Sequence, residues 1–248
     1  CLESYYQKVF DAYMRVFKRA GLKEYISVES DTGIMGGGKA HEFMSINDHG
    51  EDTLIICPKC GYRANKEVAE GIITHYPEAP KKLEKVATPN VTTIEEVAAL
   101  LQLPTHRTAK AVFYKTAENK LVFAVIRGDL EVNETKLKKI LQSKDLAFAN
   151  DEDIRAIGAV PGYASPLAID NKKVRVLIDE SVEKSNNLVC GANEKDFHYF
   201  NFNLSDLEKG TYEIVQMAAV RDGDGCVECN TALTVKKGIE IGNIFQLG

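Results

Sequence analysis

The sequence predicts an α+β protein in which one mixed domain is inserted into a smaller domain made of a helix and antiparallel strands. Helical and strand periodicities alternate along the 248 residues, which is typical of mixed α and β folds. Two Cys-x-x-Cys pairs, Cys57/Cys60 and Cys226/Cys229, are separated by about 165 residues. If one ion binds all four thiols, the chain between them must leave and return to the same place. We therefore predict an outer domain of residues 1–72 and 222–248 around an insertion of residues 73–221.

Composition excludes several classes of protein. Hydrophobic residues make up 44% of the chain and charged residues 27%, enough for one sizeable core or two modest ones. No apolar run approaches the roughly 18 to 20 residues of a membrane span. The net charge of -5 argues against nonspecific coating of nucleic acid, which depends on neutralising phosphates. The first residues lack the pattern of a secretory signal, so we expect a cytoplasmic protein with no membrane partner.

The outer domain is predicted from local periodicity. Apolar residues recur at helical spacing over residues 1–20, and residues 22–29 form a strand. A glycine-rich turn follows at residues 33–38. We expect residues 41–46 and 53–56 to form a strand pair joined by a turn at residues 47–51.

The insertion begins after a proline-containing segment, residues 74–89, that we interpret as a linker. Thr93 and Glu96 have the spacing of a capping box, which predicts that a helix opens at Ile94. Alternation predicts that residues 110–114 and 120–127 are paired strands, and helical spacing predicts helices at 133–141 and 151–157. A Gly- and Pro-rich loop follows at 158–166. Residues 174–179 have the pattern of a buried strand, and residues 189–202 continue toward the sheet.

The four paired cysteines favour a structural zinc site. Two residues between cysteines let both thiolates of a tight turn point at one ion, and two such turns complete a tetrahedron. Two alternatives remain open, namely independent turns with free thiols and a redox pair. Cys1 and Cys190 show no relation to this set.

Several long motifs resemble bacterial-type prolyl-tRNA synthetases, class II enzymes with an editing domain inserted in the catalytic domain. The resemblance spans the whole chain, and the motifs occur in the family's order. In the outer domain they are residues 31–37 (DTGIMGG), 41–44 (HEFM), 50–53 (GEDT), 57–65 (CPKCGYRAN) and 238–248 (GIEIGNIFQLG).

The insertion carries the editing domain's own signatures. Lys110 in TAKAV matches the lysine of its first strand, and Gly162 to Pro166 matches its Gly-x-x-x-Pro loop. His198, which follows the GAN stretch at residues 191–193, matches the pocket histidine, and Asp179 at the end of VLID matches a pocket aspartate. By itself, Asp179 is equally compatible with a turn-capping residue.

The resemblance implies hydrolysis of alanine wrongly esterified to proline tRNA, with the tRNA acceptor end as partner. The Gly-x-x-x-Pro loop would supply backbone N-H donors to the oxyanion, and Lys110 would contact phosphate or substrate. No Ser/His/Asp or Cys/His constellation is evident, so no covalent mechanism is predicted. The alternative is a binding module for the tRNA acceptor end that edits only within the full-length synthetase.

In the outer domain, the resemblance makes His41 a proline-pocket residue and places Gln246 near the synthetic active site. It also implies that the full-length enzyme is a homodimer that uses ATP and Mg2+ to join proline to tRNA. The sequence departs from the family at Asn243, where histidine is usual, and only some members carry all four cysteines. We expect this chain, which lacks the other class II motifs, not to form prolyl-adenylate.

Overall fold

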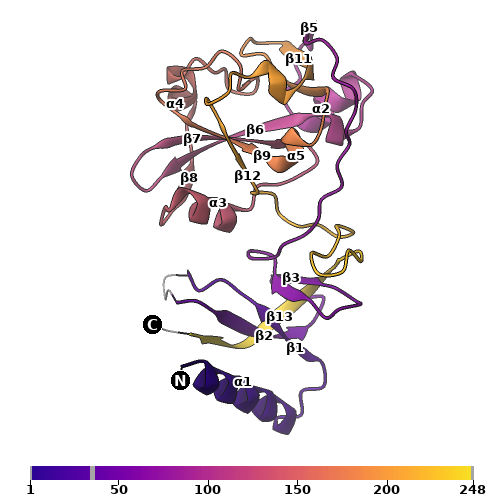
Figure 1. Ribbon diagram of the computed structural model, residues 1–248, viewed down its shortest axis with the longest axis vertical. Coiled ribbons are helices and arrows are strands. Elements are labelled where there is room, and N and C mark those ends of the chain that lie inside the picture. The colour runs from indigo at the N-terminus through magenta and orange to yellow at the C-terminus, as the bar shows by residue number, and fades with distance from the viewer. Residues whose placement is uncertain (1, 34–36, 247–248) are drawn as a thin grey trace. The chain divides into compact units, whose positions relative to one another are not determined.

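The computed structural model describes residues 2–33 and 37–246 and divides the chain into two compact units (Figure 1). Unit 1 comprises Cys1–Thr74 with Ala219–Gly248, and unit 2 comprises His75–Ala218. That residues 73–221 form a domain inserted into another one stays a prediction. No helix in the described part of the chain is long and apolar enough to cross a membrane.

Unit 1 is built from one long helix and a five-stranded sheet that closes on itself. In the sheet the strands follow the order β1-β2-β13-β3-β4, and Glu29 pairs with Ala64 in parallel to close it. The elements are α1 (Leu2–Arg19), β1 (Tyr25–Glu29), β2 (Ala40–Ile46), β3 (Asp52–Ile56), β4 (Arg63–Asn65) and β13 (Thr234–Phe245).

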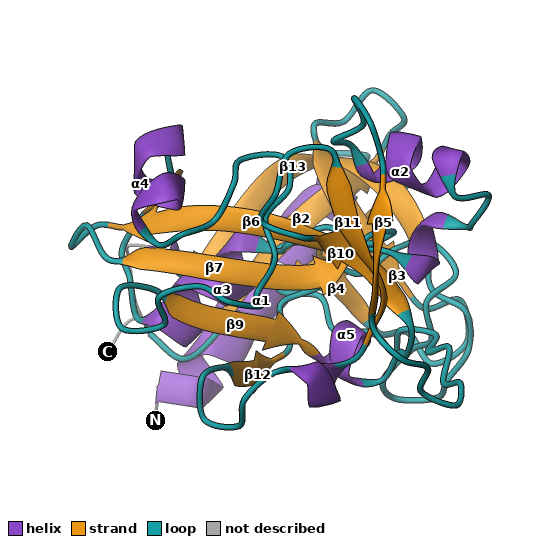
Figure 2. Cartoon of the chain, turned by 90° about the horizontal axis from the view of Figure 1, so that it is seen from above, coloured by secondary structure: helices purple, strands orange, loops and turns teal. Residues whose placement is uncertain are grey.

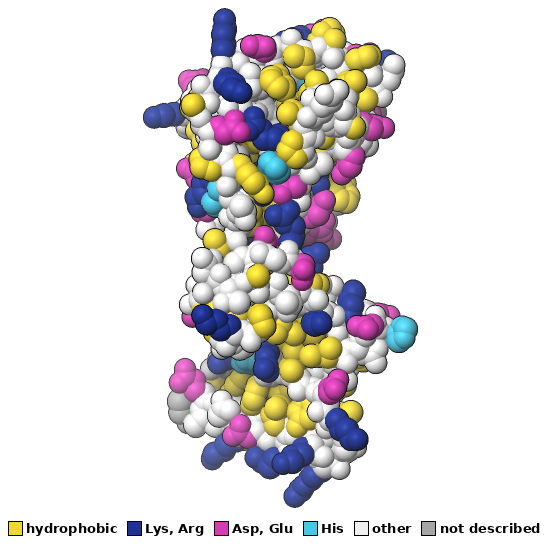
Figure 3. Space-filling model, turned by 90° about the vertical axis from the view of Figure 1, so that its right-hand side faces the viewer, with side chains coloured by type: hydrophobic (Ala, Val, Ile, Leu, Met, Phe, Trp, Pro, Cys, Tyr) yellow, Lys and Arg dark blue, Asp and Glu magenta, His cyan; other side chains and the backbone are white. Residues whose placement is uncertain are grey.

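The predicted first helix is confirmed in α1. It begins with Glu3 in its first turn and ends with Lys18 and Arg19 in its last, charges that suit the helix dipole. One face packs on the sheet, where the Tyr13 ring stacks on Phe43 at 5.0 Å between centroids. The opposite face keeps large hydrophobic side chains exposed, such as Tyr5 at 67%, and Figure 3 shows hydrophobic side chains gathered on the surface of unit 1.

The predicted pairing of residues 41–46 with 53–56 is wrong, although both strands exist. β13 lies between them, so that Gly238 is opposite Ile46 on one side and Asp52 on the other. The intervening turn must pass over this third strand, and a Cβ on Gly50 would lie 2.1 Å from the carbonyl oxygen of Gly238. Alternation marks a strand's buried face but does not say which strand lies beside it.

Unit 2 contains two sheets and short helices (Figure 2). The larger sheet has the order β12-β9-β7-β6-β8 and combines antiparallel and parallel pairs, whereas the smaller has the order β10-β11-β5. Its strands are β5 (Glu84–Ala87), β6 (Ala109–Thr116), β7 (Leu121–Arg127), β8 (Leu146–Phe148), β9 (Arg175–Asp179), β10 (Leu188–Gly191), β11 (Phe197–Phe202) and β12 (Glu213–Val215). Its helices are α2 (Ile94–Leu100), α3 (Glu134–Leu141), α4 (Asp151–Ala156) and α5 (Glu180–Glu183), with 3-10 turns at Thr105–Arg107 and Leu204–Asp206.

Several local predictions for the insertion are confirmed. Thr93 caps α2 reciprocally, because its hydroxyl accepts from the Glu96 N-H at 3.2 Å while the Glu96 carboxylate accepts from the Thr93 N-H at 3.1 Å. β6 and β7 pair in antiparallel register. The apolar sides of both sheets meet in one core, to which Phe113, Phe123 and Phe202 contribute.

Two segments differ from their predictions. The supposed linker, residues 74–89, contains β5, which pairs with β11 along Glu84–Ala87. Residues 189–202 do not extend the main sheet but supply β10 and β11 of the smaller one. The mixed charge of β5 concealed it, since an edge strand needs few apolar residues when only one of its faces is covered.

Candidate functional site

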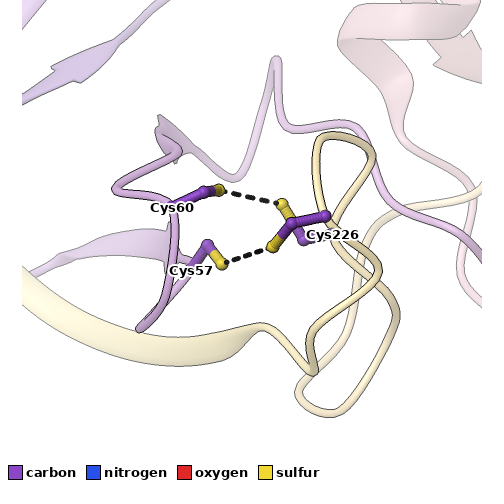
Figure 4. A group of neighbouring side chains, drawn as sticks. Cys57, Cys60 and Cys226 are labelled. Carbon is purple, nitrogen blue, oxygen red and sulfur yellow. Dashed lines mark hydrogen bonds between the residues drawn. The ribbon is translucent and has the colours of Figure 1, made fainter.

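The two Cys-x-x-Cys turns meet within unit 1 (Figure 4). The Sγ atoms of Cys57 and Cys229 are 3.6 Å apart, as are those of Cys60 and Cys226, and all four sulfur atoms lie within 4.8 Å of one another. A tetrahedron with Zn-S bonds of about 2.3 Å has sulfur atoms about 3.8 Å apart. All four cysteines are free thiols, so the cluster has the donors and the spacing of a metal site.

Local backbone geometry explains how each turn presents its thiols. Gly61 has φ +83°, a left-handed conformation that closes the first turn, and Asn230 has φ +56° at the matching position of the second. The Lys59 N-H points at the Cys57 sulfur from 3.5 Å. The hydroxyl and the backbone N-H of Thr231 lower the pKa of Cys229 to about 6, which favours the thiolate that binds metal.

A cavity of about 350 Å³ lies in unit 2 between β6, the N-terminus of α2 and the loop at residues 158–166. Three residues predicted from the sequence line it, namely Lys110, Gly162 and His198. Its size is within the range of small-molecule pockets.

Lys110 is held by an exposed partner. Its Nζ donates to the Glu131 carboxylate at 2.6 Å and to the Leu130 carbonyl at 3.0 Å. The Glu131 side chain is 75% exposed, and ion pairs of that kind contribute about 0–1 kcal/mol. A phosphate group that enters the cavity can therefore replace Glu131 at small cost.

His198 is a buried, neutral histidine. Its Nδ1 lies 2.6 Å from the Thr88 hydroxyl, and the Tyr163 ring packs against it at 5.7 Å between centroids. Burial lowers the pKa of His198 below its ordinary value, so the imidazole is uncharged at neutral pH. It shapes the cavity wall and does not supply a cation.

The loop at residues 158–166 presents two free backbone donors. Gly162, with φ +81°, and Ala164 both line the cavity, and their N-H groups have no hydrogen-bond partner among the described residues. Between and beside them, the Tyr163 N-H donates to the Val160 carbonyl and the Ser165 N-H donates to the Asn193 side chain. Two unpaired donors beside a cavity are what an oxyanion requires.

Asn193 fixes this loop. Its Oδ1 accepts from the Ser165 N-H at 2.8 Å, and its Nδ2 donates to the carbonyls of Ser165 at 3.2 Å and Leu167 at 2.6 Å. The Asn193 N-H also donates to the Tyr163 carbonyl at 2.8 Å. The sequence marked Asn193 only as part of a motif, and it gave no signal for Thr88, because neither contact is local.

Two predicted pocket residues lie outside the cavity lining. Pro166 is the last residue of the loop and is buried next to Ser165. The Asp179 carboxylate accepts from the backbone N-H groups of Ser181, Met217 and Ala218 at 2.8 to 3.1 Å. The structure therefore gives Asp179 the capping function that its place after a strand suggested, and it also anchors residues 217–218.

His41 and Gln246 lie in unit 1 on neighbouring segments. The ring of His41 on β2 lies 2.8 Å from the Tyr6 hydroxyl, and the Gln246 N-H donates to the Lys39 carbonyl at 2.8 Å, continuing the β13-β2 register. Burial, followed by the charge of Lys39, lowers the pKa of His41. Asn243 contacts Glu240 on the same strand.

Stability is expected to fall as the pH drops from 7.5 to about 5.5, because four buried or partly buried histidines are neutral in the folded state. Burial lowers the pKa of His41, His75, His106 and His198, whereas unfolded histidine titrates near 6.5. Their contribution is complete above the unfolded value and is lost as the pH falls through the lower folded values. Urea midpoints of His198→Gln should depend less steeply on pH than those of the wild type. His49→Gln removes an exposed histidine and should leave the slope unchanged; equal slopes in all three proteins would contradict this explanation.

Residues 88–208, which lie in unit 2, match the family of aminoacyl-tRNA editing domains. Over its whole length, the chain is similar to bacterial proline–tRNA ligases. It is 43% identical over 248 residues to the proline–tRNA ligase of Dehalococcoides mccartyi, covering all of this chain and 43% of the relative. It is also 43% identical, over 251 residues, to that of Caldicellulosiruptor bescii, with the same coverage. The chain thus spans less than half the length of these relatives.

Solved structures resemble the fold of part of the chain. One is the crystal structure of a hypothetical protein, APE2540, with 17% identity, a TM-score of 0.49 and coverage of 55% of this chain and 91% of the other. Another is that of a candidate trans-editing enzyme for prolyl tRNA synthetase, with 16% identity, a TM-score of 0.48 and coverage of 56% and 87%.

Proposed function

We propose that unit 2 hydrolyses the ester of a wrongly charged tRNA, and that its substrate is alanine esterified to proline tRNA. The observation that carries this proposal is the cavity in which Lys110 and the free N-H groups of Gly162 and Ala164 meet. Lys110 suits a phosphate of the tRNA, the two N-H groups suit the ester carbonyl, and the cavity suits a small acyl group.

In the proposed reaction, the terminal phosphate of the tRNA takes the place of Glu131 beside Lys110. The ester carbonyl then lies against the Gly162 and Ala164 N-H groups, which stabilise the negative charge that develops on its oxygen. Water attacks the carbonyl carbon, the bond to the ribose oxygen breaks, and that oxygen takes up a proton. His198 limits the space for the amino-acid side chain.

The proposed reaction uses no serine or cysteine nucleophile. The described residues that line it include no serine and no cysteine. The nearby Cys190 is buried against the Ser165 hydroxyl, with 3.7 Å between sulfur and oxygen, and burial raises the pKa of its thiol to about 12. A protonated, enclosed thiol is a poor nucleophile.

In unit 1, we propose that the four clustered cysteines hold a structural Zn2+. The four donors leave no coordination position open for substrate, so the ion would hold the Cys57 and Cys226 turns together. We further propose that His41 and Gln246 belong to a proline site that acts, with ATP and Mg2+, in a longer homodimeric ligase.

Deacylation of preformed Ala-tRNA(Pro) by the purified chain tests the editing proposal. Lys110→Ala should lower kcat/KM by about 10- to 100-fold, because a charge-assisted contact contributes about 1.5–3 kcal/mol. Lys81→Ala removes an exposed lysine that does not line the cavity and should react as the wild type does.

One alternative is a module that binds the acceptor end and edits only within the full-length synthetase. The net charge of -5 favours this alternative, because it disfavours strong tRNA binding by the chain alone. Binding of the tRNA with no hydrolysis above the buffer rate would establish that alternative. Full activity of Lys110→Ala would show that Lys110 does not contact the tRNA phosphate in the reaction.

A further inference from the structure

Unit 2 contains a second cavity, of about 670 Å³, that the proposed reaction does not use. It lies where β6 ends and β7 begins, beside α4 and the start of β9. Figure 2 shows these elements. Five cationic side chains line it against two carboxylates, in a chain whose net charge is -5. The cations are Lys115, Lys120, Lys172, Lys173 and Arg175, and the carboxylates are Asp153 and Glu213.

Three of these cations are already paired. Lys115 contacts Asp153 at 2.7 Å, and Lys173 contacts Asp170 at 3.2 Å. Arg175 binds Glu213 through two hydrogen bonds of 2.8 Å each.

Lys120 and Lys172 are exposed, and neither forms a salt bridge with another described residue, although the charge of Lys172 also acts on the Asp170 carboxylate. Two exposed ammonium groups beside a cavity attract an anion, and they suit phosphate because lysine acts as a point charge of no fixed geometry.

The two cavities share the same secondary structure elements. Lys110 borders the first and Lys115 the second, five residues further along β6, a distance of about 17 Å at strand geometry. α4 borders both, with Ile154 on the first and Ala156 on the second. Because Lys110 and Lys115 are five residues apart, their side chains project from opposite faces of β6. A nucleic acid strand that ends in the first cavity would therefore reach the second by passing α4, which borders both.

We propose that the second cavity binds backbone phosphates of the RNA strand whose 3′ end enters the editing cavity. This inference rests on the proposed function. Lys120 and Lys172 make the contacts, and they position the strand without reading its bases. An inorganic phosphate ion carries the same chemistry, and the experiment separates it from RNA.

The test measures binding of an uncharged RNA hairpin with a 3′ CCA end across a range of salt concentrations. For Lys120→Ala/Lys172→Ala, the slope of log K against log salt should be smaller by about 1.4, since each phosphate contact on a single strand contributes about 0.7. The matched control, Lys81→Ala/Lys82→Ala, removes two exposed lysines outside both cavities and should keep the wild-type slope.

The possible outcomes separate the two proposals. A reduced slope in the Lys120/Lys172 variant alone supports the inference even if no ester is hydrolysed, because the probe carries no amino acid. An unchanged slope, or an equal reduction in both double variants, overturns it, and the deacylation assay is then unaffected. Titration with inorganic phosphate completes the test. If phosphate binding needs both lysines while the salt slope for RNA is unchanged, the cavity binds a small anion and the inference is overturned.

Discussion

Replacement of Gly191 with alanine is expected to slow ester hydrolysis by about 100-fold and to destabilise unit 2 by about 1–3 kcal/mol. A Cβ at this position would lie 2.2 Å from the Tyr163 carbonyl oxygen and 2.3 Å from that of Ala164. Both atoms are backbone, so the loop that carries the Gly162 and Ala164 donors must move. A displacement of about 1 Å at a catalytic group lowers a rate by about 100-fold.

The control for this variant is Gly21→Ala in unit 1, which lines neither cavity of unit 2. Gly21 has φ +83°, but a Cβ there would meet no atom within 4 Å, so only backbone strain of about 1–2 kcal/mol is added. Thermal unfolding and deacylation of both variants should separate the two effects: Gly21→Ala loses stability and keeps its rate per folded molecule, whereas Gly191→Ala loses both. Wild-type turnover by Gly191→Ala would show that the loop does not supply the donors.

Removal of one cysteine ligand should release the metal and unfold the turns that it joins. We expect about one zinc ion per purified chain, and little in Cys226→Ser, whose position is fully buried among the four sulfur atoms. Structural zinc sites contribute about 10–16 kcal/mol of binding free energy in small domains. Unit 1 has other cores, built around Phe43 and Met44, so we expect it to lose stability by a part of that amount.

The control for the metal experiment is Cys190→Ala, which removes a buried cysteine in unit 2 and should leave the zinc content unchanged. Elemental analysis gives the metal content, and unfolding with and without a chelator gives its effect on stability. If the wild type contains no metal and added zinc does not change its stability, the proposal is contradicted and free thiols are favoured. A reversible Cys57–Cys229 disulfide would favour the redox alternative.

The sequence was informative where a feature is encoded locally. The Thr93 capping box, the amphipathic α1 and the alternating strands β6 and β7 each carry their own signal within a few residues. Lys110, Gly162 and His198 were found through family motifs, and the structure places all three around one cavity. Asp179 and Pro166 came from the same motifs and lie outside the lining, because a motif gives order along the chain and not the direction of a side chain.

By itself, the sequence determined that distant segments must meet, since two Cys-x-x-Cys turns can complete one metal site only when the chain returns to its starting point. Only the tertiary structure decided how they meet. It placed β13 between β2 and β3, paired β5 with β11, and left the Gly162 and Ala164 N-H groups free. The physical reason is that periodicity records which face of an element is buried, whereas hydrogen-bond partners across a sheet or loop are chosen by residues far away in the chain.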